Sequence, residues 1–239
     1  MNINSKSQIK QDLFVLNMCK FKKNGYFIEL GANDAYEDSN TYLLEKGYEW
    51  KGIMVENDDS YIQSYKNERP NSIYVIDDAT KIDYIELFNK NNVPKNIDYL
   101  QIDLEPANRS SIDVLEYFDK HIFDKYKFAT ITFEHDIYHI KKNEFKNKHY
   151  VFIYTRNKSR EIFEKHGYIR VFSDVSDDEE NNFTFPYEDW YIHPDLIDIN
   201  HVNDIIDKNK DNYFYDKNID MKIIYHNKIV GLYKNNNYL

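Results

Sequence analysis

Short apolar runs alternate with segments of helical period over the first 150 residues of the chain. Such runs, bounded by polar or glycine residues, are typical of strands buried on both faces of a sheet. The predicted strands are residues 26–30, 52–56, 72–76, 97–102 and 128–133. Because strands that alternate with helices form parallel βαβ units, the pattern predicts an α/β fold with a doubly wound sheet.

The pattern changes after about residue 150. Residues 156–166 have the spacing of a helix, and residues 168–175 have that of a strand. An acidic loop follows, and residues 183–185 are expected to return as the second strand of an antiparallel hairpin. These two late strands and the five earlier ones predict a mostly parallel, seven-stranded, Rossmann-like sheet.

We expect one domain over residues 1–207, with an amphipathic helix at residues 8–20 as an N-terminal addition. Residues 208–239 are polar and are treated as a C-terminal extension, to which the sequence assigns no role. This extension holds one candidate strand, at residues 221–225.

The chain carries a formal net charge of −10, and its sequence pI is near 5.3. Binding to a phosphate backbone needs clustered lysine and arginine, so this balance argues against a nucleic acid as the main partner. Cys19 is the single cysteine, and no apolar run reaches the ~20 residues of a membrane-spanning helix. The polar start also lacks the apolar stretch of a signal peptide, so we expect a cytoplasmic protein without a membrane partner.

Doubly wound sheets bind ligands at the carboxyl ends of their strands, so the residues after each predicted strand are candidates for a site. Gly31 and Ala32 let the backbone approach a ligand closely. Glu56 can accept both hydroxyls of a ribose, and Asp77 and Asp78 can face an adenine amino group. The candidate cofactor-binding residues are Glu29, Gly31, Ala32, Asn33, Asp34, Asn40, Thr41, Glu56, Asn57, Asp77, Asp78, Ala79 and Asp103.

The acid-rich mouth of this site indicates which cofactor it suits. The loop after the first predicted strand lacks G-x-G-x-x-G, and the chain contains no G-x-x-x-x-G-K-[ST]. A pyrophosphate would need more backbone N–H donors and fewer acids. The sulfonium of S-adenosylmethionine, a positive centre, fits better than NAD.

Two of these assignments have plain alternatives. An acid at the end of a strand often only caps the next helix. Asn40 and Thr41 either contact the methionine part of the cofactor or form a helix N-cap together with Ser39.

Several segments together resemble the FkbM family of methyltransferases, over roughly residues 10 to 200. They are GYFIELGAND at 25–34, SNTYLLE at 39–45, WKGIMVE at 50–56, IDYLQIDLE at 97–105, FEH at 133–135 and PYEDW at 186–190. The resemblance implies a methyltransferase sheet, S-adenosylmethionine as cofactor and O-methylation. The acceptor it implies is a hydroxyl of a sugar or glycan, or of a related small molecule. Two positions depart from the family, which usually has glycine where this chain has Ala35 and Pro106.

Methyl transfer from sulfur to oxygen is an in-line displacement in which the enzyme mainly aligns the acceptor with the methyl group. An aliphatic hydroxyl is a poor nucleophile, so a base or a metal ion must help to remove its proton. His135, oriented by Glu134, is the preferred base, and its alternative is a polar strand-end residue without a catalytic role. Asp103 and Glu105 are alternative bases and, with Glu134, candidate oxygen ligands for Mg²⁺.

Other classes stay open on the sequence alone. One is an RNA or protein methyltransferase, although the acidic pI disfavours RNA. Another is a cofactor-binding module that no longer catalyses, which the departures at Ala35 and Pro106 suggest. A nicotinamide oxidoreductase is disfavoured by the missing glycines, and association into a homodimer is neither indicated nor excluded.

Overall fold

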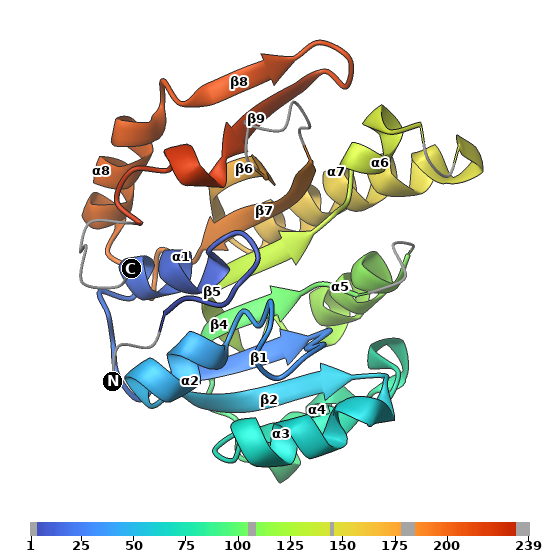
Figure 1. The fold of residues 1–239 in the computed structure, drawn as a ribbon, viewed down its shortest axis with the longest axis vertical. Helices are drawn as coiled ribbons and strands as arrows, with labels where there is room; N and C mark the ends of the chain where they lie inside the picture. Colours follow the sequence, from blue (N-terminus) through green and yellow to red (C-terminus); the bar gives the residue numbers. More distant parts are fainter. Residues whose placement is uncertain (1–3, 105–108, 144–145, 178–184, 233–239) are drawn as a thin grey trace.

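The computed structural model describes residues 4–104, 109–143, 146–177 and 185–232. Within them, one sheet of nine strands has the order β3-β2-β1-β4-β5-β7-β6-β9-β8 (Figure 1). Its parallel strands are β1 (Tyr26–Leu30), β2 (Lys51–Glu56), β3 (Ile73–Ile76), β4 (Asn96–Ile102) and β5 (Lys127–Glu134). The predicted α/β fold with a mostly parallel sheet is confirmed.

A late antiparallel pair follows, as expected. It consists of β6 (Ile169–Ser176) and β7 (Pro186–Ile192), and β7 also runs antiparallel to β5. The return strand was predicted at residues 183–185, which lie almost wholly outside the described residues, whereas the observed strand begins at Pro186.

The prediction of seven strands is wrong, because residues 208–239 add two more. They are β8 (Tyr213–Asp216) and β9 (Met221–Tyr225), which pair antiparallel with each other. Strand β9 then runs parallel to β6 through Val175 and Ser176. The segment that was predicted to be a separate extension therefore continues the same sheet. Its pairing with β6 cannot be predicted from the local sequence pattern.

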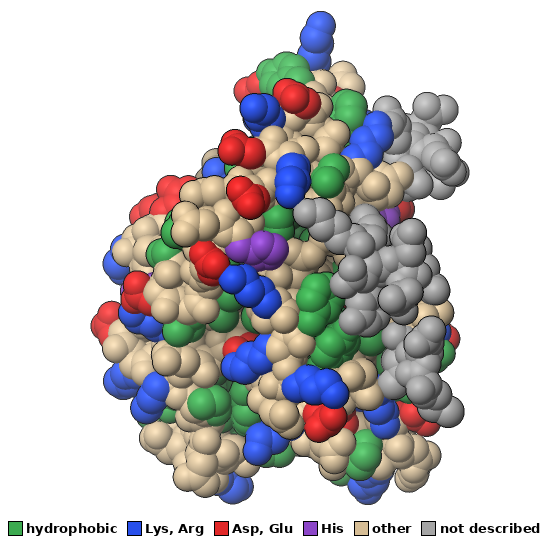
Figure 2. Space-filling view, turned by 90° about the vertical axis from the view of Figure 1, so that its left-hand side faces the viewer, with side chains coloured by type: hydrophobic (Ala, Val, Ile, Leu, Met, Phe, Trp, Pro, Cys, Tyr) green, Lys and Arg blue, Asp and Glu red, His purple; other side chains and the backbone are tan. Residues whose placement is uncertain are grey.

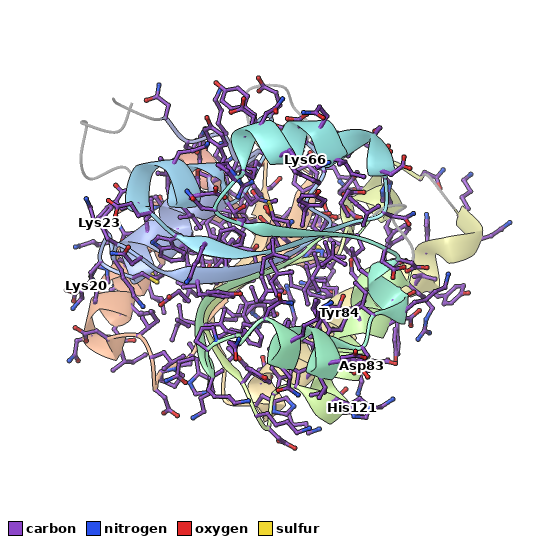
Figure 3. All side chains as sticks on the ribbon, turned by 90° about the horizontal axis from the view of Figure 1, so that it is seen from below. Lys20, Lys23, Lys66, Asp83, Tyr84 and His121 are labelled. Carbon is purple, nitrogen blue, oxygen red and sulfur yellow. The ribbon has the colours of Figure 1, made fainter. Side chains whose placement is uncertain are left out.

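Helices cover both faces of the sheet. They are α1 (Gln11–Met18), α2 (Tyr42–Tyr48), α3 (Ile62–Glu68), α4 (Tyr84–Lys90), α5 (Ser110–His121), α6 (Tyr138–Lys141), α7 (His149–Lys165) and α8 (Ile199–Asn209). Short 3₁₀ turns are η1 (Asp59–Tyr61), η2 (Ala79–Lys81), η3 (Lys146–Lys148) and η5 (His226–Lys228). Viewed along the sheet, Lys66 of α3 lies on one side, and Tyr84 of α4 and His121 of α5 lie on the other (Figure 3).

Two apolar cores follow from this arrangement. Helices α1, α2, α3 and α8 pack on one face, and helices α4, α5 and α7 pack on the other. In the first core, Trp190 is buried against Phe14 and Phe172, with ring centroids 4.9 and 5.8 Å away. Trp190 is therefore a packing residue, and the N-terminal helix is an integral part of this core.

Alternation along the strands places a polar row on the face covered by α1, α2 and α3. Register pairs Glu29 with Gln101, and Gln101 with Thr132. At the carboxyl end of the same face, Glu134 lies opposite Glu188. Because paired residues share a face, these side chains gather where the parallel strands end.

Among the described residues, no helix has both the length and the apolar character needed to cross a bilayer. On the face drawn in Figure 2, basic and acidic side chains are interspersed and do not gather by sign.

Candidate functional site

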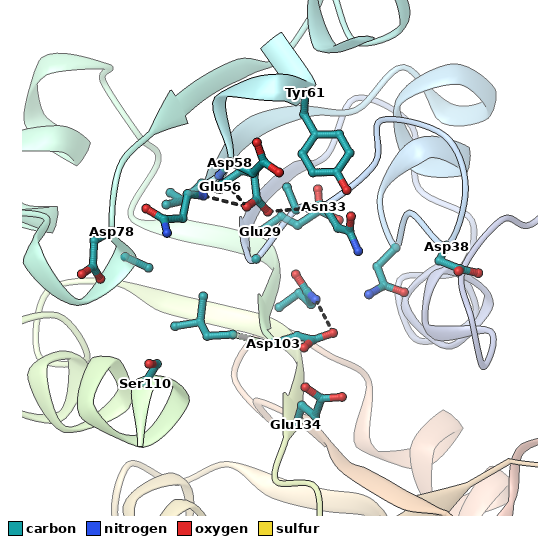
Figure 4. A pocket seen from close by; sticks show the side chains of 18 of the residues that line it. Glu29, Asn33, Asp38, Glu56, Asp58, Tyr61, Asp78, Asp103, Ser110 and Glu134 are labelled. Carbon is teal, nitrogen blue, oxygen red and sulfur yellow. Dashed lines mark hydrogen bonds between the residues drawn. The ribbon is translucent and has the colours of Figure 1, made fainter. Parts of the chain in front are cut away.

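A cavity of about 550 Å³ opens at the carboxyl ends of the parallel strands. It lies where the strand order reverses between β1 and β4, which is the usual ligand position in such sheets. Twelve of the sequence-predicted residues line it: Glu29, Gly31, Ala32, Asn33, Asn40, Glu56, Asn57, Asp77, Asp78, Ala79, Asp103 and Glu134. Figure 4 shows Glu56, Asp78, Asp103 and Glu134 around this one space.

Gly31 is a tight crossing point in the cavity wall. Its φ is +84°, and a Cβ at this position would lie 1.6 Å from the carbonyl oxygen of Asp103. The N–H groups of Gly31 and Ala32 both donate to Val55 O, at 3.0 Å. Glycine is therefore required here by conformation and by space together.

The departure at Ala35 does not disturb this loop. Ala35 is fully buried and does not adopt a positive φ. The left-handed conformations fall instead on Asn33 and Asp38, residue types that tolerate them. Pro106, the other departure, lies outside the described residues.

Glu56 is held by three backbone donors. Its Oε2 accepts from Asn33 N at 2.8 Å, and its Oε1 accepts from Asn57 N and Asp58 N at 2.7 and 3.0 Å. A carboxylate offers about four acceptor positions, so about one is left for a ligand. The sequence suggested that Glu56 accepts both ribose hydroxyls, whereas its backbone donors leave room for one.

Asp78 lies across the cavity from Glu134 (Figure 4), and its neighbour Asp77 also lines the cavity. Asp78 accepts from Thr80 N and Thr80 Oγ1, at 2.9 and 2.6 Å, and so caps η2. Hydrogen bonds from Thr80 and Lys81 lower the pKa of Asp78 to about 2. Asp78 therefore caps a turn and also lines the cavity, whereas its contact with an adenine stays a prediction.

A buried polar network supports the other wall. Thr41 Oγ1 donates to Glu29 at 2.6 Å and accepts from Arg69 at 2.5 Å, while Arg69 also pairs with Glu45 at 2.9 Å. Arg69 donates further to Ser39 at 3.1 Å, and its side chain is 1% exposed. Burial raises the pKa of Glu29 to about 7 despite Arg69. Thr41 thus positions Glu29 and does not itself line the cavity.

Two acids from adjacent strands, Asp103 and Glu134, lie at the floor of the cavity, and a third, Glu188, lies beside Glu134 without lining it. Asp103 follows β4, Glu134 ends β5, and Glu188 lies opposite Glu134 on β7. Burial and the neighbouring Asp103 raise the pKa of Glu134 well above its usual value. Burial raises the pKa of Glu188 to about 8, although Trp190 Nε1 donates to it at 2.7 Å.

Gln101 belongs to the same floor and was missed by the sequence reasoning. It lines the cavity, is 2% exposed, and donates from Nε2 to Asp103 at 3.4 Å. Its Oε1 is buried without a hydrogen-bond partner. A polar side chain in an apolar strand, two positions before Asp103, was the available signal.

His135 does not reach this cavity. It follows Glu134 and packs on the opposite face of the sheet, where its Nε2 lies 3.5 Å from Asp174 and 3.7 Å from Asp189. Its side chain is fully buried, and burial lowers its pKa. The prediction of His135 as the base, oriented by Glu134, is therefore not supported, because neighbouring strand-end residues point to opposite faces.

Two arginines of α7 bind the carboxylates beside His135. Arg156 binds both oxygens of Asp174, each at 2.6 Å, and Arg160 binds both oxygens of Asp189, at 2.6 and 2.7 Å. These pairs tie α7 to β6 and β7, which indicates a structural role.

The remaining predicted residues are placed as follows. Asp34 does not line the cavity, and its carboxylate accepts from the N–H groups of Tyr36 and Glu37 at 2.8 and 2.9 Å. Glu105 lies outside the described residues. Lining residues that were not among the predicted site residues include Gln8, Tyr61, Ser110, Tyr138 and Tyr187. Tyr138 and Tyr187 make an edge-to-face contact with ring centroids 5.1 Å apart, and neither the helix nor the strand that holds them was predicted at its observed bounds.

No protein-family model matches the chain, and no curated protein matches it. The FkbM resemblance therefore stays a prediction from the motifs.

The similarity of this chain to solved structures of other proteins is distant. A TehB-like SAM-dependent methyltransferase from Corynebacterium glutamicum has a TM-score of 0.43 and 10% identity, with 77% of this chain and 87% of that chain covered. Fibrillarin from Aeropyrum pernix, with natively bound S-adenosyl-L-methionine, has a TM-score of 0.43 and 11% identity, with coverage of 72% and 67%. Likenesses this distant carry no argument about function, which must come from the site.

Proposed function

We propose that the chain is an S-adenosylmethionine-dependent O-methyltransferase that acts on a hydroxyl of a sugar, a glycan or a related small molecule. The observation that carries the proposal is the row of carboxylates at successive strand ends around one cavity, from Asp78 through Glu56 and Glu29 to Asp103. S-adenosylmethionine is a nucleoside with a cationic sulfonium and an ammonium, so it suits this charge better than a pyrophosphate does.

Each part of the cavity has a role under this proposal. Glu56, pinned by three backbone N–H groups, accepts one ribose hydroxyl, and Asp77 and Asp78 face the adenine. Glu29, held by Thr41, faces the positively charged methionine part. The cofactor supplies the methyl group.

The acceptor half of the cavity lies toward Asp103, Glu134, Tyr138 and Tyr187. Tyrosine rings can stack on a sugar, and the carboxyls can bind hydroxyl groups. The displacement forms an O–C bond as the C–S bond breaks, and the hydroxyl must lose its proton. Asp103 and Glu134 lie where a base or a ligand that acidifies the hydroxyl is needed.

The same acids weigh against a nucleic-acid acceptor. A phosphate backbone entering this cavity would meet Asp103 and Glu134, and the formal net charge of the chain is −10. We therefore propose a small-molecule or glycan acceptor and no nucleic-acid partner.

The test is calorimetric titration of the full chain with S-adenosylhomocysteine and, separately, with NAD⁺. We expect micromolar binding of the first and no measurable binding of the second. Radiolabelled S-adenosylmethionine with a panel of sugars, glycans, RNA and peptides then identifies the acceptor. Failure to bind S-adenosylhomocysteine would refute the proposal, and labelling of RNA or peptide alone would refute the acceptor class.

A further inference from the structure

We propose that the floor of the cavity binds one hard divalent cation, such as Mg²⁺, through the carboxylates of Asp103 and Glu134 and the amide oxygen of Gln101. All three side chains line the same cavity. They come from two neighbouring strands, with Gln101 and Asp103 from β4 and Glu134 from β5. Oxygen atoms from carboxylates and amides are the ligands such ions prefer.

The amide oxygen of Gln101 is an unused acceptor in this floor. Its Nε2 donates to Asp103 at 3.4 Å, which fixes the orientation of the amide, because the flipped form would set two acceptors against each other. The Oε1 atom is thereby left buried without a partner in a side chain that is 2% exposed. A buried acceptor in this position calls for a donor or a cation.

The charge around that oxygen favours a cation. Ile102 pairs with Phe133, so the residues that follow them, Asp103 and Glu134, lie next to each other at the ends of neighbouring strands (Figure 4). Glu188, opposite Glu134 on the neighbouring strand, adds a third acid on the same face. Ionised carboxylates this close repel each other, and the repulsion is relieved either by a proton or by a cation among them.

A second group of metal-like side chains is already neutralised. Among the described residues, His135, Asp174 and Asp189 form a group with suitable atoms within 4.8 Å of one another. Arg156 and Arg160 bind both oxygens of each of these two acids, so an ion there would have to displace two guanidinium groups. By contrast, no arginine is among the described residues that line the cavity, so the acids at its floor are not neutralised in this way.

The proposed ion gives the acceptor half of the cavity a chemical function. Mg²⁺ in proteins is usually held by one or two carboxylates, with its other positions filled by water or substrate. An acceptor hydroxyl in such a position becomes more acidic and can lose its proton to water in the open cavity. This role rests on the proposed function, whereas the binding of the ion does not.

The test is calorimetric titration of the purified full chain with Mn²⁺ alone, without cofactor or acceptor. We expect one ion per chain, with affinity at least about tenfold weaker in Asp103→Asn and in Glu134→Gln. Gln101→Glu should bind Mn²⁺ more tightly than the unmodified chain, an outcome that misfolding cannot imitate. Glu86→Gln, an exposed acid of α4 outside the cavity, is the matched control and should leave the affinity unchanged.

Absence of Mn²⁺ binding, or equal binding in Asp103→Asn and Glu134→Gln, would overturn the inference. So would loss of binding in His135→Gln with retention in Glu134→Gln, because the ion would then lie on the opposite face. If Mn²⁺ binds as expected while S-adenosylhomocysteine does not, the proposed function fails and the metal site stands.

Discussion

Replacement of Glu56 by glutamine tests the assignment of the ribose end of the cavity. The carboxylate accepts from Asn33 N, Asn57 N and Asp58 N at 2.7 to 3.0 Å. A glutamine has one acceptor oxygen and one NH₂ group, so in either orientation the NH₂ group faces at least one of these backbone donors. The change therefore disorders the binding position and also removes the charge that a ribose hydroxyl would meet.

The expected magnitude follows from the hydrogen bonds that an amide cannot make here. A hydrogen bond to a charged group contributes about 1.5–3 kcal/mol, and an unsatisfied donor adds a penalty that solvent reduces at this half-buried site. We expect cofactor binding to weaken by about 2–3 kcal/mol, which is roughly 30- to 150-fold in Kd.

The assay is calorimetric titration with S-adenosylhomocysteine, with Glu86→Gln as the matched control for removal of one surface charge. Circular dichroism of both variants should match the unmodified chain. An affinity for Glu56→Gln within about twofold of the unmodified chain would refute the ribose assignment.

Three further predictions concern other parts of the site. Gly31→Ala should abolish binding of S-adenosylhomocysteine, because its Cβ would lie 1.6 Å from the carbonyl oxygen of Asp103; calorimetry checks this. Arg69→Met leaves Glu45 buried without its cationic partner and should lower the free energy of unfolding by about 3–5 kcal/mol, measured by urea denaturation. The pKa of Glu29 is raised to about 7, so its carboxyl is neutral below that pH and binds the cationic cofactor poorly. Binding at pH 6 should therefore release close to one proton, seen as a buffer-dependent enthalpy, whereas binding at pH 8.5 should release almost none.

Each of these predictions has a control in the chain. Gly167 also has a positive φ, +81°, but a Cβ there has room, so Gly167→Ala should lower stability by only about 1–2 kcal/mol and keep cofactor binding. Arg109→Met removes an exposed guanidinium and should change stability by less than about 1 kcal/mol. Proton release that persists at pH 6 in Glu29→Gln would assign the titration to another group.

The sequence alone determined the parallel half of the sheet and the position of its ligand site. Strand β1 was predicted at its observed bounds, and β2, β3, β4 and β5 within one residue at each end. Because the carboxyl ends of parallel strands lie at one edge, residues as distant in sequence as Gly31 and Asp103 were expected to meet, and they do. The order of the apolar runs along the chain is enough to predict this meeting, because each βαβ unit is right-handed and joins strands that are close in sequence.

Strand β7 shows where local patterns fail. Its acids Glu188 and Asp189 break the apolar run that marks a buried strand. Both are stabilised by partners from elsewhere in the fold or from the strand itself, with Trp190 Nε1 on Glu188 and Arg160 on Asp189. A pattern of polarity cannot indicate that a buried acid has such a partner.

Tertiary structure alone decided which residues share the site. His135 and Glu134 are neighbours in sequence, yet the strand end directs them to opposite faces, so one enters an ion-pair network and the other enters the cavity. Arg69 lies 24 positions from Glu45 and joins the network that holds Glu29. The pairing of β9 with β6 is equally non-local. These outcomes depend on which face packs against which helix, and that is settled by burial across the whole sheet rather than by the residues beside each position.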